Sequence, residues 1–338
     1  MVSFYHRDEI MPSDQNRHFL FFFKNLLQLP SVIAYFSLTK YRNMRKIFAL
    51  LYVMATAACT HAQEAAPEIR KVNYPVGYTS QLNVIYTTAP GWEGKMDLYL
   101  PPKEKGLSPA IINIHGGGWV SGSKDTQGGF NSYFKSGFAI ANIAYRLSGQ
   151  ATAPAAIEDT RCALIYLIKN AKALNIDVNK IIIMGGSAGG HLALMGGLLG
   201  NDSRFDTNCA GVKNVKVVAI IDKYGIVDVG EKRYGKFRSG SEKKWLGDKV
   251  NDQGFIASVS PIEVVNKNSP PIFIVHGDAD PTVPIQQSID LKKKMDELSV
   301  KSEFMVIPGG LHGKFTAAQN TEVDAAIMKF ILSLKEFK

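Results

Sequence analysis

Short apolar runs alternate with longer amphipathic stretches from about residue 95 to the end of the chain. The short runs are almost continuously apolar, which is typical of strands that are buried on both faces of a sheet. The longer stretches place apolar side chains at helical spacing. Strands are predicted at residues 96–100, 110–114, 138–144, 180–184, 215–221, 272–275 and 301–307. Helices are predicted at residues 153–174, 188–199, 285–298 and 321–334.

This order of elements predicts an α/β fold in which helices flank one mostly parallel central sheet. Residues 64–94 are expected to add antiparallel strands at an edge of that sheet. Residues 223–268 interrupt the rhythm, because they contain no clear strand and are frequent in Gly, Lys and Arg. Since they lie between two predicted strands, they are expected to form a small cap insertion over the strand ends.

A secretory signal is predicted near the N-terminus. Arg42, Arg45 and Lys46 precede an apolar run over residues 47–59, and small residues follow. This is the three-part pattern of a signal peptide, and cleavage is expected after Ala62. The mature protein would then be exported to the periplasm or the extracellular medium.

Export would divide the chain into three parts. Residues 1–43 are an upstream extension outside the fold, residues 44–62 the signal peptide, and residues 63–338 the catalytic domain. The apolar stretch between residues 19 and 36 is interrupted by polar residues and a proline, so no transmembrane span is predicted.

The cysteines leave two questions open. A lipid anchor at Cys59 is an alternative to simple secretion, although Thr56 stands where such anchors usually have a bulky aliphatic residue. Cys162 and Cys209 would remain in the exported chain, in an oxidising compartment. They either form a disulfide or stay as two buried thiols, and the sequence does not decide between these.

The charge of the chain argues against nucleic acid as a partner. The 39 Lys and Arg against 30 Asp and Glu give a net charge of +9, of which +5 remains once the first 62 residues are removed. No basic run is interleaved with aromatic residues. A solvated surface of mixed charge is therefore expected.

A serine stands at a glycine-rich junction between a predicted strand and a predicted helix. Ser187 has Gly185 and Gly189 two positions to either side. A nucleophile on a sharp strand-to-helix turn needs neighbours without bulky side chains, and the start of the helix supplies backbone N–H groups beside it. Ser187 is therefore predicted to be the nucleophile, with the N–H of Ala188 as a donor to an oxyanion. The alternative is a turn that merely packs tightly.

Three successive glycines follow the strand at 110–114, within the sequence His-Gly-Gly-Gly-Trp of residues 115–119. They free the backbone to turn the N–H groups of Gly116 and Gly117 toward a developing negative oxygen. A phosphate-binding loop is the alternative, but no Lys-Ser or Lys-Thr pair follows. Gly116, Gly117 and Ala188 are therefore predicted to form the oxyanion hole.

The remaining members of a catalytic triad are expected after the last two strands, because active sites of such sheets lie at the carboxyl ends of the strands. Asp280 is preferred to Asp278 as the orienting acid, since it stands just before the turn at Pro281. His312 is the predicted general base. The order Ser187, Asp280, His312 along the chain is that of this type of triad.

Elimination supports the choice of the base. His115, His191 and His276 precede or follow the predicted motifs and are expected to be structural, each satisfying a local backbone group. Trp119 and Tyr224 are candidates for the substrate pocket, although aromatic residues at such places are as often core as contact. No metal-ligand set such as His-Glu-x-x-His occurs, so neither a metal ion nor an organic cofactor is expected.

Together with Tyr145-Arg146-Leu147, these motifs resemble the α/β-hydrolases grouped as bacterial feruloyl-esterase-like, which are close to the hormone-sensitive-lipase-like carboxylesterases. The resemblance spans roughly residues 70–337. It implies the α/β-hydrolase fold and the hydrolysis of carboxylic esters, including acetyl or feruloyl esters on polysaccharides, so a small-molecule or glycan ester is the expected partner.

Two other functions stay open. Residues 276–284 are also similar to a loop of prolyl-oligopeptidase-type peptidases, so an acyl-peptide or dipeptide hydrolase is the second hypothesis, although no propeller domain precedes the catalytic region. The third is a non-catalytic binding scaffold, which would require a damaged triad.

Overall fold

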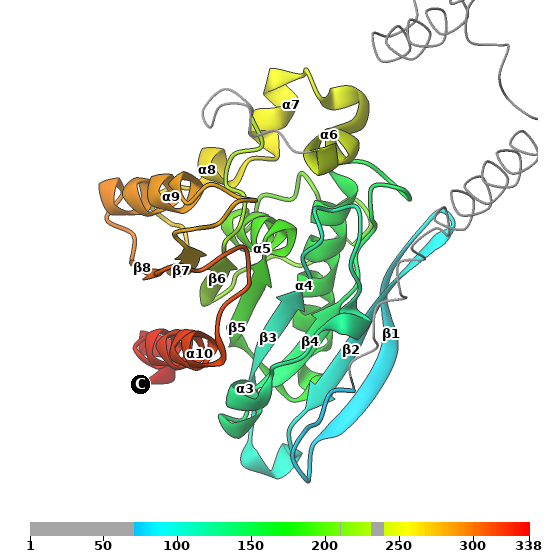
Figure 1. Cartoon of the computed structure of the whole chain (residues 1–338). Coiled ribbons are helices and arrows are strands. Elements are labelled where there is room, and N and C mark those ends of the chain that lie inside the picture. Colours follow the sequence, from blue (N-terminus) through cyan, green and yellow to red (C-terminus); the bar gives the residue numbers. More distant parts are fainter. Residues whose placement is uncertain (1–70, 210, 231–239) are drawn as a thin grey trace, which may run out of the picture. The chain divides into compact units, whose positions relative to one another are not determined.

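The computed structural model describes residues 71–209, 211–230 and 240–338. Their centre is an eight-stranded sheet with the order β1-β2-β4-β3-β5-β6-β7-β8 (Figure 1). Neighbouring strands from β4 to β8 are parallel, whereas β2 runs antiparallel to both β1 and β4. The strands are β1 Thr79–Ala89, β2 Trp92–Leu100, β3 Ser108–Ile114, β4 Ala139–Ile143, β5 Ile176–Gly186, β6 Ala219–Lys223, β7 Ile272–Gly277 and β8 Ser302–Ile307.

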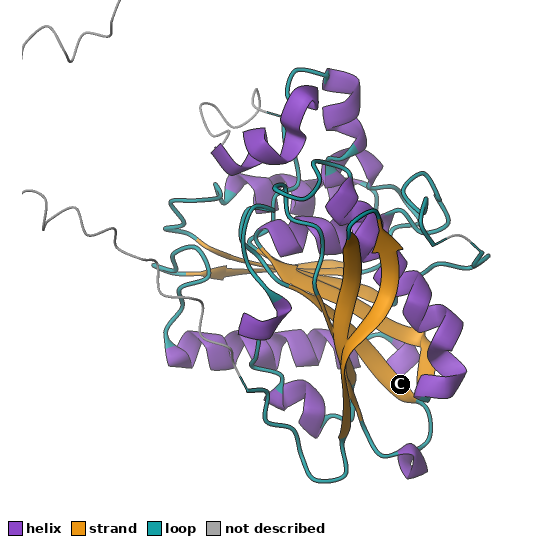
Figure 2. Ribbon diagram, turned by 90° about the vertical axis from the view of Figure 1, so that its right-hand side faces the viewer, coloured by secondary structure: helices purple, strands orange, loops and turns teal. Residues whose placement is uncertain are grey.

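Helices cover both faces of the sheet (Figure 2). Buried side chains of α4, α5 and α9 join one core cluster with one set of strand residues, and those of α3 and α10 join a second cluster on the opposite face. All residues of β4 and β7 are buried, which explains their continuous apolar runs. These helices are α3 Asn131–Lys135, α4 Ala155–Leu174, α5 Ala188–Leu198, α9 Gln286–Glu297 and α10 Ala317–Leu332.

The expected α/β architecture is confirmed, with β1 as the antiparallel edge strand. The strand predicted at residues 215–221 begins later in the structure, where β6 starts at Ala219. Val215 and Val217 are buried, yet the amide of Val215 donates to the side chain of Asn201 rather than to a neighbouring strand. The apolar run at residues 215–221 therefore predicted buried side chains correctly, but its first residues do not pair with a neighbouring strand.

Three short α-helices and one 3-10 turn lie between β6 and β7, in the described part of the segment that was expected to form a cap. The α-helices are α6 Gly240–Leu246, α7 Gln253–Ser258 and α8 Pro261–Val264, coloured yellow in Figure 1. Trp245 of α6 is fully buried and its carbonyl accepts from the amide of Ala153, so α6 is held against the loop before α4.

Cys162 of α4 forms a disulfide with Cys209, which follows α5 in the chain. The sequence had left this pairing open. Beside it, the buried side chain of Arg161 forms an ion pair with Asp206 at 2.8 Å, so a covalent and an ionic link join the same two segments.

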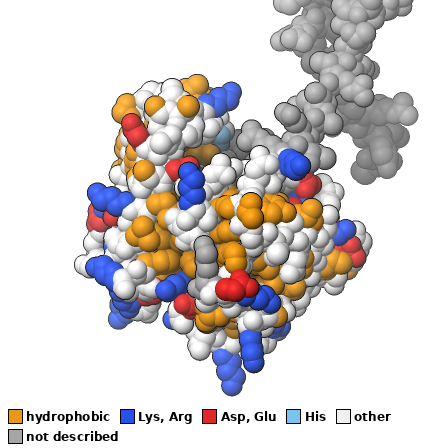
Figure 3. All heavy atoms as spheres, turned by 90° about the horizontal axis from the view of Figure 1, so that it is seen from below, with side chains coloured by type: hydrophobic (Ala, Val, Ile, Leu, Met, Phe, Trp, Pro, Cys, Tyr) orange, Lys and Arg blue, Asp and Glu red, His pale blue; other side chains and the backbone are white. Residues whose placement is uncertain are grey.

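The predicted extension, signal peptide and lipid-anchor site lie outside the described residues. Within the described ranges, no helix is long and apolar enough to span a membrane. On the face drawn in Figure 3, Lys and Arg side chains are scattered among acidic and apolar ones rather than gathered in one continuous surface.

Candidate active site

The nucleophile candidate Ser187 lies on a tight turn between β5 and α5. Its φ of 58° is in the left-handed region, and its amide donates to the carbonyl oxygen of Lys223 at 2.9 Å. A Cβ atom on Gly185 would overlap the carbonyl of Gly189, and one on Gly189 would overlap that of Ile114. The glycines are therefore required by the close approach of backbone segments, and this packing fixes the position of Ser187 at the sheet edge.

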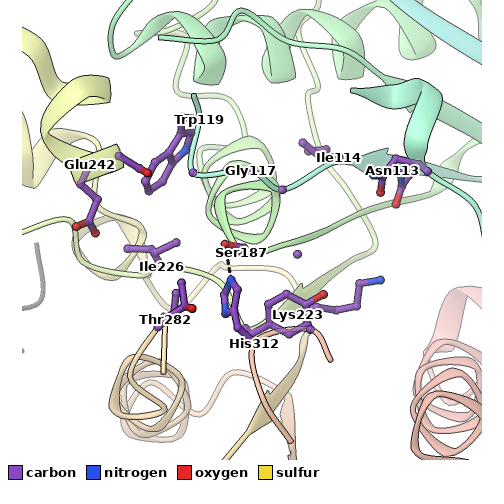
Figure 4. A pocket seen from close by; sticks show the side chains of 18 residues that line it. Asn113, Ile114, Gly117, Trp119, Ser187, Lys223, Ile226, Glu242, Thr282 and His312 are labelled. Carbon is purple, nitrogen blue, oxygen red and sulfur yellow. Dashed lines mark hydrogen bonds between the residues drawn. The ribbon is translucent and has the colours of Figure 1, made fainter. Parts of the chain in front are cut away.

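The structure brings the three side chains predicted to form the triad into one hydrogen-bonded chain. His312 Nε2 lies 2.8 Å from Ser187 Oγ, and His312 Nδ1 lies 2.6 Å from Asp280 Oδ2 (Figure 4). Because a carboxylate only accepts, Nδ1 carries the proton and Nε2 is left to accept the serine hydroxyl. The three residues come from junctions after β5, β7 and β8, where parallel strands end at the same edge of the sheet.

Asp280 is held as a carboxylate. Burial alone would raise its pKa, but hydrogen bonds from His276, His312 and two backbone amides outweigh burial and hold the pKa well below its usual range. The amides are those of Thr282 and Val283, at 2.7 and 2.9 Å from Oδ1.

The competing acid, Asp278, is exposed and does not contact His312. Its Oδ1 accepts from the amide of Gly309 at 2.6 Å, so it stabilises the turn after β8. The geometry therefore favours Asp280 as the residue that orients the imidazole.

The other three described histidines each bond a backbone carbonyl, as expected for structural residues. His115 donates to Gly116 at 2.7 Å, His191 to Val259 at 2.8 Å and His276 to Val283 at 2.9 Å. Burial lowers the pKa of His115 and of His191 to about 4, so both are neutral at pH 7. His276 does more than the sequence indicated.

The additional contact of His276 is with the acid of the triad. Its Nε2 lies 3.2 Å from Asp280 Oδ2, and its Nδ1 lies 2.7 Å from the hydroxyl of Ser288. The side chain is fully buried. It therefore helps to fix the carboxylate oxygen that His312 also contacts, a role visible only once β7 and the following loop are folded.

The carbonyl groups of the glycine loop after β3 accept hydrogen bonds from neighbouring residues. The carbonyl of Gly116 accepts from His115, and that of Gly117 accepts from the amides of Val120 and Ser121 at 3.1 and 3.0 Å. In a planar trans peptide the next N–H points the opposite way. The N–H groups that follow these carbonyls, on Gly117 and Gly118, therefore point away from the tied carbonyls.

Gly116 itself packs against the turn that carries Ser187. A Cβ atom on Gly116 would lie 2.8 Å from the carbonyl oxygen of Gly186, and Gly117 has a φ of +117°. Both positions therefore need glycine. Gly116, Gly117 and Ser187 line one cavity, and Ala188 follows Ser187 at the start of α5. The tied carbonyls bear only on the N–H of Gly117 among these three residues, and Gly116, Gly117 and Ala188 stay the predicted oxyanion donors.

The cavity in front of Ser187 has a volume of about 480 Å³. Tyr224 lines it, with its ring centroid 5.0 Å from that of His312, and burial raises the pKa of its hydroxyl to about 12. Trp119 also lines the cavity, but it is only 1% exposed and stacks on Trp245 at 4.5 Å. Trp119 is therefore chiefly a core residue that anchors the wall of the cavity.

Two charged residues that the sequence did not single out also line the cavity. Lys223 is the last residue of β6, and Glu242 belongs to α6. Lys223 stood next to the predicted Tyr224 at a strand end, which was a usable signal. Glu242 gave none, because its position depends on how the segment before β7 folds. Among the described residues, no group of three or more His, Cys, Asp or Glu side chains could hold a metal ion.

Comparison with known proteins assigns the chain to a family. The BD-FAE family model matches residues 96–295. The chain belongs to the BD-FAE family, within the α/β-hydrolase carboxylesterases. This BD-FAE protein is 30% identical to a truncated carbohydrate esterase from gut microbiota, over 75% of this chain and 97% of that chain, with a TM-score of 0.65. An acetyl ester-xyloside bifunctional hydrolase from Caldicellulosiruptor lactoaceticus, at 24% identity, 77% and 97% coverage and a TM-score of 0.63, shares the fold.

Curated relatives of this BD-FAE protein are named as esterases. Esterase LipC of Mycobacterium tuberculosis (strain ATCC 25618 / H37Rv) is 27% identical over 61% of this chain and 53% of its own length. Isoprenylcysteine alpha-carbonyl methylesterase ICME of Arabidopsis thaliana is 25% identical over 80% of this chain and 64% of its own length. The chain spans about half the length of the first of these relatives.

Proposed function

We propose that this BD-FAE protein is a serine esterase that hydrolyses carboxylic esters through an acyl intermediate on Ser187. The observation that carries the proposal is the hydrogen-bonded chain from Ser187 through His312 to Asp280, which opens on a cavity beside the glycine loop. An intact chain of this kind argues against a non-catalytic scaffold.

In the first half of the reaction, Ser187 Oγ attacks the ester carbonyl while His312 Nε2 takes the hydroxyl proton. The N–H groups of Gly116, Gly117 and Ala188 stabilise the negative oxygen of the tetrahedral intermediate. Asp280 is ionised, so it stabilises the imidazolium that forms and keeps Nδ1 protonated. His312 then gives its proton to the leaving alcohol, and the acyl-serine ester remains.

In the second half, His312 takes a proton from a water molecule, which attacks the acyl-serine carbonyl. The same three N–H groups stabilise the second tetrahedral intermediate. Collapse of that intermediate returns the proton to Ser187 Oγ and releases the carboxylic acid. Each group is restored, and no metal or redox step is needed for this sequence.

Acetyl or feruloyl esters on polysaccharide are the substrates we propose. The similarity to proteins named as a carbohydrate esterase and as an acetyl ester-xyloside hydrolase supports this choice. The polar and charged groups among the cavity residues, with Gln127, Lys223 and Glu242 among them, suit a substrate that carries hydrogen-bonding groups.

The decisive experiment compares the wild type with Ser187→Ala on a short-chain nitrophenyl ester. We expect the variant to lose activity by about 10⁴-fold or more, since removal of one triad member removes nucleophilic catalysis. Equal rates would eliminate Ser187 as the nucleophile. Panels of acetylated glycans, feruloylated glycans and aminoacyl amides then separate the proposed substrates from those of a peptidase.

A further inference from the structure

A lysine lies in the cavity next to the nucleophile. Lys223 ends β6, and its carbonyl oxygen accepts the amide proton of Ser187, so the two residues are fixed relative to each other by the backbone. Its side chain is partly buried and lines the cavity. The hydrolytic mechanism does not use it.

The strand register places this lysine on the same sheet face as a second polar residue of the cavity. Asn113 of β3 pairs with Met184 of β5, and Lys223 pairs with Gly186, two positions further along β5. Because side chains alternate between faces, Asn113 and Lys223 project from the same face of the sheet. Gly186 between them carries no side chain, and the ring of Tyr224 packs against it.

The ammonium group of Lys223 lacks a contacting counter-ion in the part of the chain that the structure describes, and it donates no hydrogen bond there. Burial of the ammonium group lowers its pKa, and Asp324 of α10 attracts it without forming an ion pair. Keeping an ammonium group away from water costs free energy unless an anion compensates. A ligand anion would supply that compensation.

The opposite side of the cavity carries a negative group. Figure 4 shows Glu242 of α6 and Lys223 on opposite sides of Ser187, with Asn113 on the side of Lys223. Glu242 is 6% exposed, and α6 is held in place by the stacking of Trp245 on Trp119. An anionic group of a bound ester is therefore attracted to the Lys223 side of the cavity.

We propose that Lys223 binds a carboxylate group carried by the substrate, so that acidic esters are preferred to neutral esters of the same size. This inference rests on the proposed esterase function and specifies its substrate class. The carboxylate can belong to the acyl group, as in a half-ester of a dicarboxylic acid, or to the alcohol, as in an ester of a uronic acid sugar. The chemistry that Lys223 recognises is the same in both.

Two matched pairs of substrates distinguish these sources. Monoethyl succinate against ethyl butyrate places the charge in the acyl group, with release of ethanol as the readout. Acetylated methyl glucuronoside against acetylated methyl glucoside places it in the alcohol, with release of acetate as the readout. We expect the wild type to favour the charged member in one pair by about 10- to 100-fold in kcat/KM, as for a charge-assisted hydrogen bond.

Substitution of Lys223 tests whether this residue causes the preference. Lys223→Met should reduce the preference to near unity, mainly by raising the KM of the charged substrate, and Lys223→Arg should keep most of it. The preference of the wild type should also weaken with added salt. Lys180→Met is the matched control, because Lys180 is a partly buried lysine on β5 that does not line the cavity, and it should leave the ratio unchanged.

Two results would overturn the proposal: no preference for the charged member in either pair, or a preference that Lys223→Met leaves intact. If Lys223→Met folds poorly by thermal melting, competitive inhibition of Lys223→Gln by succinate and by glucuronate replaces it, and inhibition equal to that of the wild type would count against the proposal. Activity that survives in Ser187→Ala would defeat the esterase function itself. A Ser187-dependent esterase without the preference would defeat only the role of Lys223.

Discussion

The two aspartates of the loop after β7 offer a direct comparison between an orienting and a structural acid. Asp280→Asn should lower kcat for a nitrophenyl ester by about 10³- to 10⁴-fold, because an amide donor facing Nδ1 favours the wrong imidazole tautomer. Asp278→Asn should change kcat less than about threefold, since Asp278 contacts the turn after β8 and not His312. Steady-state kinetics of both variants at pH 8 make the measurement. Equal losses would show that the geometry of the loop, and not the charge of Asp280, matters.

A second residue-scale prediction concerns a buried acid beneath the site. Asp222 is fully buried, and burial raises its pKa to about 7, although His276 and a hydrogen bond from the amide of Gly225 act to lower it. Its pKa in the unfolded chain is about 3.9. Between these values the unfolded state binds fewer protons than the folded state, so Asp222 makes stability fall as pH rises from about 4 to about 7.

Asp222→Asn should remove this dependence. The free energy of unfolding of the variant, relative to the wild type, should therefore increase from pH 5 to pH 8, by at most about 1.4 kcal/mol per pH unit. The buried histidines His115 and His191 act in the opposite sense, because their lowered pKa values make the folded protein less stable as pH falls from about 6.5 toward 4. Both histidines are present in the wild type and in the variant, so their effect cancels in the difference. Denaturant melts across this pH range provide the test, with exposed Asp278→Asn as a control. A difference that is independent of pH would contradict it.

At the scale of single residues, the sequence predicted the site residues that lie directly at strand ends, within glycine-rich or loop motifs. Ser187 and His312 were predictable because their neighbours in the chain create the turn that presents them. His276 and Glu242 were not, because their roles depend on contacts between segments that are distant or irregular. Lys223 lies between these cases: its position at a strand end was readable, but which face it occupies required the register of β5 and β6.

The elements were predicted well where burial and hydrogen bonding coincide. β3 and β7 are apolar runs that are also paired on both sides, so pattern and structure agree. α10 begins at Ala317, four residues before the predicted residue 321, because Thr316 and Gln319 form a capping box ahead of the apolar periodicity. α3 was missed because a five-residue helix is too short to establish a period.

The link between α4 and the segment after α5 carries a prediction at the same scale. Cys162 and Cys209 are 47 residues apart in sequence, and a disulfide that closes a loop of this size stabilises by about 2–4 kcal/mol. The double variant Cys162→Ala/Cys209→Ala should therefore melt at a lower temperature, by roughly 5–15 °C. Its kcat/KM at 25 °C should stay within about twofold of the wild type, because neither cysteine lines the cavity.

Reduction of the wild type with dithiothreitol should reproduce the shift in melting temperature. The double variant should not respond to the same treatment, which makes it the control. An unchanged melting temperature in the double variant would mean that the remaining contacts between these segments, including the Arg161–Asp206 ion pair, suffice without the covalent bond.

At the scale of the whole molecule, the site is assembled where several parallel strands end. The sheet supplies Ser187, Asp280 and His312 from three junctions, the loop after β3 adds the glycines, and the segment before β7 contributes α6 to one side of the cavity. The sheet part of this arrangement follows from the alternation of strands and helices. The contribution of α6 does not, because short helices without periodicity depend on tertiary packing, here of Trp245 on Trp119.

Export of the protein is the last prediction, and the disulfide gives it a chemical basis. Disulfides persist in oxidising compartments and are rare in the cytosol, so the pairing of Cys162 with Cys209 is in keeping with the signal peptide predicted at residues 44–62. The protein recovered from the exported fraction of a bacterial host should begin at Gln63, as measured by N-terminal mass spectrometry. Deletion of residues 44–62 should keep the chain in the cytosol, where alkylation should find both cysteines as free thiols. A start at Met1 in the exported protein would refute cleavage, and an added lipid mass at Cys59 would show that the chain is anchored instead.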